Sequence, residues 1–67
     1  METTTDIYVN SSAAVIHKVR AGSRIQILAS PLDFCGEPGW ADVRVQETSG
    51  KIWRGYAHLE TLTAGTA

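Results

Sequence analysis

The sequence predicts a small all-β domain, and three observations carry this prediction. Apolar and polar residues alternate along several stretches, which is the pattern of a strand with one buried face. These stretches are rich in Val, Ile, Tyr and Trp, residues typical of strands, and turns with glycine separate them. The chain has only 67 residues, and closing the strands into a barrel would remove the edges that a thin open sheet exposes. We therefore expect a small five-stranded barrel.

The first half of the chain is expected to form three strands. Short apolar stretches predict the first two, over residues 6–9 and 15–19. A third strand is predicted over residues 24–28, where clean alternation places Ile25 and Ile27 on one face.

The second half is expected to hold a long loop and a hairpin. Residues 29–39 contain both prolines and two glycines, which predicts the long loop. Residues 40–46 alternate again, residues 47–50 form a tight turn, and residues 51–58 form the return strand. Residues 59–62 are expected to form a single helical turn followed by a short final strand.

Composition indicates one ordinary globular domain, with 43% hydrophobic and 19% charged residues. We expect the barrel to occupy residues 6–62. Residues 1–5 and 63–67 are small and polar with nothing to bury, so both ends are expected to be flexible.

The charge pattern argues against a general nucleic-acid binder. The formal net charge is -1, whereas proteins that bind the phosphate backbone concentrate Lys and Arg. No apolar run is long enough to span a membrane. Glu2 and Asp6 stand where a signal peptide would be basic and then apolar, so a cytoplasmic location is expected.

No residue constellation points to catalysis, a cofactor or a metal. Cys35 is the only cysteine and cannot form a disulfide within the chain. Its spacing from His17 and His58 fits neither a zinc motif nor a nucleophile and base pair. Asp33 and Glu37 are expected to be solvated carboxylates of the long loop.

Two parts of the chain resemble the bacterial SH3-like (SH3b-type) family. Residues 15–28 follow its order of a short apolar strand, a turn and an alternating strand. Residues 39–45 look like its Gly-Trp-x-x-Val strand, and residues 55–62 look like its closing Gly-aromatic element ending in Leu. The resemblance implies an SH3-like barrel that binds a protein or, in exported members, a cell-wall peptide.

The departures from the family fall in loops and in its ligand groove. Residues 10–13 replace a common Gly-Pro pair, residues 29–39 are longer than usual, and residues 52–54 add to the closing element. His58 and Thr61 stand where eukaryotic SH3 domains carry a proline and a tyrosine. Recognition of polyproline ligands is therefore not expected.

Trp40 is the most informative candidate for partner binding. In SH3-like domains the corresponding tryptophan lies at the edge of the ligand groove. Alternation independently places it opposite Ala41, Val43 and Val45, outside the core, and an exposed Trp is a frequent binding hot spot. The alternative is a sealing role, with Trp40 packed over the long loop or over Tyr8.

The other aromatic side chains divide between binding and packing. Phe34 is expected to pin the long loop to the barrel, and Trp53 to pack. The complete set of candidate partner-binding residues is Trp40, Tyr8, Phe34, Tyr56 and His58.

Three functions remain open at this point. The first is a non-catalytic binding or assembly module that contacts a protein or cell-wall peptide through the face of Trp40 and Tyr8. The second is a structural or regulatory subunit that self-associates through a sheet edge, with Ile52 and Trp53 as contacts. The third is a nucleic-acid-binding barrel, because residues 22–45 loosely resemble the KOW motif. Its basic candidates are Arg20, Arg24, Arg44, Lys51 and Arg54.

Overall fold

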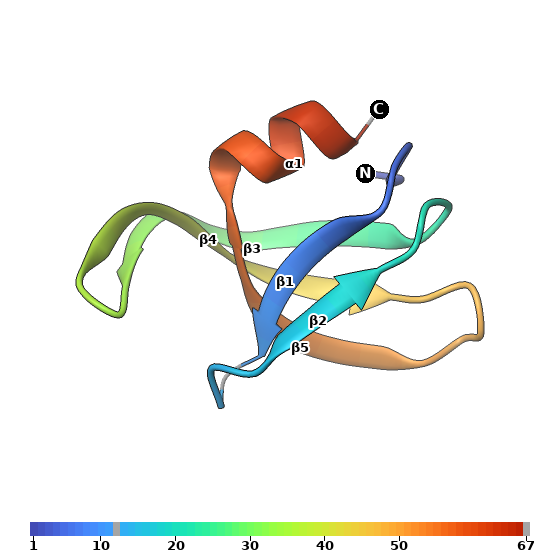
Figure 1. The fold of residues 1–67 in the computed structure, drawn as a ribbon, viewed down its shortest axis with the longest axis horizontal. Coiled ribbons are helices and arrows are strands. Elements are labelled where there is room, and N and C mark those ends of the chain that lie inside the picture. The colour runs from blue at the N-terminus through green and yellow to red at the C-terminus, as the bar shows by residue number, and fades with distance from the viewer. Residues whose placement is uncertain (12, 67) are drawn as a thin grey trace.

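The computed structural model describes residues 1–11 and 13–66 as five strands and one helix (Figure 1). The predicted all-β class is confirmed. The elements in chain order are β1 (Ile7–Ser11), β2 (Ile16–Val19), β3 (Arg24–Phe34), β4 (Glu37–Gln46), β5 (Ile52–His58) and α1 (Leu59–Gly65).

The strands form one antiparallel sheet in the order β2-β1-β5-β4-β3. The N-terminal segment adds a further connection, because Glu2 bridges Arg24 and the N–H of Thr3 donates to the carbonyl of Ser23. These bonds tie the edge strand β3 to the segment that leads into β1. Among the described residues β2 and β3 form no ladder with each other, so full closure of the barrel stays a prediction.

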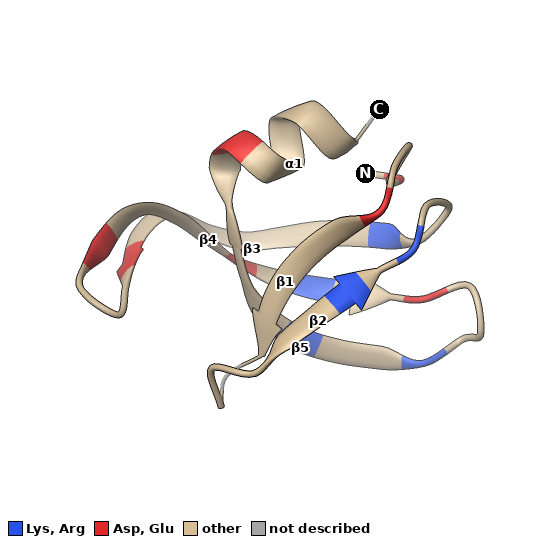
Figure 2. Cartoon of the chain, viewed as in Figure 1, with Lys and Arg blue, Asp and Glu red and all other residues tan. Residues whose placement is uncertain are grey.

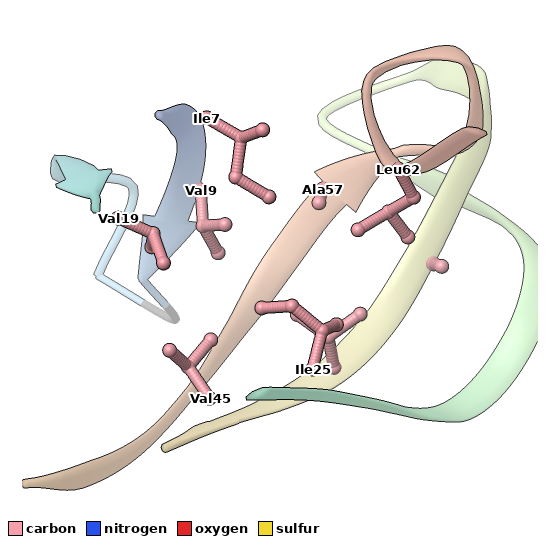
Figure 3. Close-up of a cluster of buried hydrophobic side chains, with 9 residues drawn as sticks. Ile7, Val9, Val19, Ile25, Val45, Ala57 and Leu62 are labelled. Atoms are coloured by element: carbon pink, nitrogen blue, oxygen red, sulfur yellow. The ribbon is translucent and has the colours of Figure 1, made fainter. Parts of the chain in front are cut away.

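The core lies on the inner face of this curved sheet (Figure 3). The predicted alternation of β4 is confirmed, because Ala41, Val43 and Val45 are all fully buried. Ile25 joins them, but Ile27 is 38% exposed. Ile27 lies on the edge strand where the regular ladder with β4 ends, so the core does not cover it. The core cluster comprises Ile7, Val9, Val19, Ile25, Ala41, Val43, Val45, Ala57 and Leu62.

The long loop predicted for residues 29–39 is wrong. These residues continue β3 and β4 as a hairpin whose two-residue turn is Cys35-Gly36. Both turn residues have positive φ, 52° and 78°, as a tight hairpin turn of the primed type requires. Pro31 is tolerated because β3 is an edge strand with register shifts.

The sequence predicts the position of the C-terminal helix correctly but not its length. The helix α1 runs through residues 59–65 where a single turn and a final strand were expected. Its Leu62 is 2% exposed and covers one end of the core. In the part of the chain that the structure describes, no helix has the length and apolarity needed to cross a membrane.

Both ends of the chain contact the sheet, so the expectation that they bury nothing is wrong. Thr3 is 2% exposed and its hydroxyl donates to the carbonyl of Arg20. Gly65 packs so tightly that a Cβ atom there would lie 2.3 Å from a methyl carbon of Ile7. Thr66 then bridges Thr3, which places the two ends side by side (Figure 1).

Candidate functional site

Four aromatic rings lie in contact on the outer face of the sheet, opposite the core. Phe34 lies over Tyr56 with ring centroids 4.4 Å apart and an interplanar angle of 20°. Trp40 lies 4.9 Å from Phe34 and 3.8 Å from His58. We call Phe34, Trp40, Tyr56 and His58 the aromatic cluster.

The register of β4 and β5 explains this gathering. Directly paired residues of antiparallel strands share a face, and Trp40 pairs with His58 while Asp42 pairs with Tyr56. Near the tip of the β3–β4 hairpin, the ring of Phe34 contacts both Trp40 and Tyr56. Counted back from the predicted 47–50 turn, a regular register would pair residue 46 with residue 51, whereas Gln46 pairs with Ile52, so the sequence alone would have placed β5 one residue out of register.

Trp40 is on the outer face, as alternation predicted, but it is only 7% exposed. The prediction of an exposed tryptophan is therefore wrong, because the rings of Phe34 and His58 lie against it. The sealing role over residues 29–39 is confirmed by the Phe34 contact. The indole N–H of Trp40 is buried and has no acceptor among the described residues.

The surface of the cluster is formed by the other three rings. Phe34 and Tyr56 are half-buried, and the His58 side chain is 46% exposed. Nε2 of His58 on β5 lies 4.0 Å from a carboxylate oxygen of Glu37 on β4. The expected packing role of Phe34 is confirmed by its two ring contacts.

Tyr8 lies on the same outer face but apart from the cluster. It is 60% exposed and pairs with Lys18 of β2. Its ring stacks on none of the cluster rings within the described residues. The face predicted to carry both Trp40 and Tyr8 therefore has a buried tryptophan on β4 and an exposed tyrosine on β1, in the neighbouring strand pair.

An ion pair adjoins the cluster that the sequence did not single out. Arg54 donates to the Asp42 carboxylate at 2.5 Å. Together with Gly55 and Tyr56, these two side chains line a pocket of about 270 Å³. Hydrogen-bonding groups thus stand beside the Tyr56 ring, an arrangement that can orient a bound chain.

The side chains considered for catalysis or metal binding lie apart. Cys35 is exposed at the hairpin tip, whereas the ring of His17 lies against Trp53 and the ring of His58 lies against Trp40. Within residues 1–11 and 13–66, no group of three or more His, Cys, Asp or Glu side chains could hold a metal ion.

The contacts proposed for self-association do not lie on an edge strand. Ile52 is 49% exposed, but β5 is the central strand of the sheet order. Trp53 is half-buried against the core, as its expected packing role requires. Its indole N–H donates to Glu47 at 2.9 Å.

No family model, curated protein or solved structure matches this chain.

Proposed function

We propose that this chain is a non-catalytic binding or assembly module that contacts a protein or peptide through the outer face of its sheet. The barrel would be of the SH3-like kind, and the proposed location is the cytoplasm. The observation that carries this proposal is the aromatic cluster, which lies outside the core.

The cluster has the properties of a binding surface. Aromatic rings supply large contact areas with few rotatable bonds. The rings of Phe34, Tyr56 and His58 are already held by stacking on one another or on Trp40. Binding of a partner would therefore restrict little additional motion of these side chains, which lowers the entropic cost of binding.

The partner would be an extended segment or a flat protein surface. The Asp42–Arg54 pair beside Tyr56 supplies both an acceptor and donors. Exposed Tyr8 supplies further contact area on the neighbouring strand pair. A cell-wall peptide is a narrower version of the same proposal and would require export.

The test uses a phage-displayed random peptide library selected on the intact chain. We expect selected peptides to quench or shift the emission of Trp40, measured in a Trp53→Phe background so that only one indole reports. Tyr56→Ser should weaken binding by at least about tenfold, the loss typical of a central aromatic contact.

Ile52→Ser is the matched control, because Ile52 is an exposed apolar residue of the same strand and face but lies outside the cluster. It should leave binding unchanged. Failure to select any peptide, or peptides that bind Tyr56→Ser as well as the wild type, would reject the proposal.

A self-associating subunit is the second candidate, favoured by the free strand β2. This strand lies at the end of the sheet order, and Ile16 on it is 64% exposed. Exposed apolar edge strands pair readily with a second copy. Sedimentation at rising concentration tests this, and Ile16→Lys should abolish any dimer that is formed.

A further inference from the structure

The outer face carries a second feature, an arginine patch made of Arg24, Arg44 and Arg54, which lies nearer the 47–50 turn than the aromatic cluster does. Paired residues of adjacent strands place Gln26, Arg44 and Arg54 side by side. The next outward-facing row contains Arg24 and Gln46. Figure 2 shows the basic residues of these strands lying toward the 47–50 turn, away from the acidic tip of the β3–β4 hairpin.

Two positively charged side chains of the patch face each other directly on neighbouring strands. Arg44 and Arg54 are cross-strand partners, an arrangement that destabilises a sheet. Asp42 neutralises Arg54 through their ion pair. Arg24 and Arg44 form no salt bridge with any carboxylate of the described residues.

The two unpaired arginines border the same hollow. Arg24, Gln26, Arg44 and Gln46 line a pocket of about 210 Å³ together with Met1 and Ile25. Its polar side chains are two guanidinium groups and two amides. Guanidinium groups bind carboxylates through two parallel hydrogen bonds, and the amides supply further donors.

We propose that this arginine patch binds an acidic, extended segment of a partner protein, with two carboxylates placed two residues apart. Arg24 on β3 and Arg44 on β4 lie in successive outward-facing rows and are diagonal neighbours, a relationship that places residues about 7–8 Å apart. Side chains at alternate positions of an extended peptide are about 6.6 Å apart, close to this separation. Such a segment lying along β3 and β4 would offer one carboxylate to each arginine.

Charge favours a short acidic segment over a nucleic acid. A phosphate backbone is bound tightly only when many cations replace its counterions. Here the chain has a net charge of -1, and the carboxylate of Asp42 stands beside the patch. Two unpaired arginines match two carboxylates. This proposal rests on the arginines alone and does not depend on binding at the aromatic cluster.

The experiment measures binding of a dye-labelled peptide in which Glu alternates with Thr, by fluorescence anisotropy at low salt. A peptide with Gln in place of every Glu is the ligand control. We expect saturable binding of the Glu peptide only. Arg24→Gln and Arg44→Gln should each weaken it by about two- to fivefold, the range for exposed ion pairs.

Arg20→Gln is the matched protein control, since it removes the same charge at an exposed position outside the three pockets. It should leave affinity within error of the wild type. Tyr56→Ser should also retain the peptide, which separates this proposal from binding at the aromatic cluster. Thermal unfolding of each variant checks that the fold is intact.

Three results would overturn the proposal. The first is equal binding of the Glu and Gln peptides, or no binding of either. The second is an equal loss of affinity in Arg20→Gln and Arg44→Gln, which would indicate net charge alone. The third is a single-stranded oligonucleotide that binds more tightly than the Glu peptide and depends on Arg44.

Discussion

The indole N–H of Trp53 donates a hydrogen bond to the carboxylate of Glu47 across the β4–β5 turn, with 2.9 Å between the donor nitrogen and the oxygen. The ring of His17 lies on the same indole, with centroids 4.9 Å apart. Through Trp53, these contacts link the β4–β5 turn to β2.

Replacing Glu47 tests the strength of that hydrogen bond. Glu47→Ala leaves a half-buried donor without its acceptor, so we expect the free energy of unfolding to fall by about 1 kcal/mol. Glu47→Gln keeps an acceptor at the same position and should lose clearly less. Urea unfolding followed by tryptophan fluorescence measures both, and equal losses would mean that the hydrogen bond is not the source of the stability.

The contact between β1 and β5 requires a glycine at position 55. A Cβ atom there would lie 2.4 Å from the carbonyl oxygen of Asn10 and 2.9 Å from a methyl carbon of Val9. Because the first of these neighbours is backbone, we expect Gly55→Ala to cost about 3 kcal/mol, the upper part of the range for overpacking.

Gly39→Ala separates this clash from backbone strain. Gly39 has a φ of 85°, but a Cβ atom there would meet nothing within 4 Å. Its cost should be about 1 kcal/mol, from the left-handed backbone conformation alone. Thermal unfolding of the two variants measures both losses of stability. A smaller loss in Gly55→Ala than in Gly39→Ala would contradict the expected close approach of β1 to β5.

Phe34 is expected to stabilise the hairpin through its two ring contacts. Phe34→Ala removes stacking on Tyr56 and the contact with Trp40, so stability should fall by about 1–2 kcal/mol. It should also expose Trp40 and shift its emission to longer wavelength. Leu28→Ala is the control, because Leu28 lies on the same strand but is 42% exposed. An unshifted emission in Phe34→Ala would show that the ring does not shield Trp40.

Asp6 is expected to give the fold an acid-sensitive component of stability. The backbone N–H of Ala21, and then Lys18, lower the pKa of the Asp6 carboxyl from its usual 3.8. A lowered pKa in the folded state stabilises the fold above the usual value, and this contribution is lost as the pH falls through the folded value.

Asp6→Asn should therefore reduce stability at neutral pH and make no difference well below pH 3.8. Asp33→Asn is the control, because Asp33 is exposed and lies near the hairpin tip. Chemical unfolding at several pH values tests this, and a loss in Asp6→Asn that is the same at every pH would contradict it.

The strands with regular alternation could be predicted from sequence because one of their faces is buried. Residues 40–46 lie in β4, and residues 52–58 of the predicted 51–58 strand form β5. The 47–50 turn is closed by a hydrogen bond from the N–H of Gly50 to the carbonyl of Glu47. For residues 29–39 the sequence predicts a loop, since prolines and glycines usually break strands. On an edge strand, proline loses no ladder hydrogen bond, and the positive φ of Gly36 suits a tight turn.

The candidate site was only partly accessible to sequence reasoning. Alternation correctly placed Trp40 outside the core, but it carries no information on what covers that outer face. Burial of Trp40 depends on its contact with Phe34 across the β3–β4 hairpin, and the two-residue turn that sets this contact lies where the sequence predicts a loop. The pairing of Arg44 with Arg54 depends likewise on cross-strand register.

The bridge between Thr3 and Thr66 has a consequence for engineering. Because the N-terminal and C-terminal segments lie next to each other, this domain could be inserted into a surface loop of a host protein with little distortion of the host's backbone. The same adjacency permits circular permutation, with new termini cut at the exposed residues 48–50 and the old ones joined by a short linker.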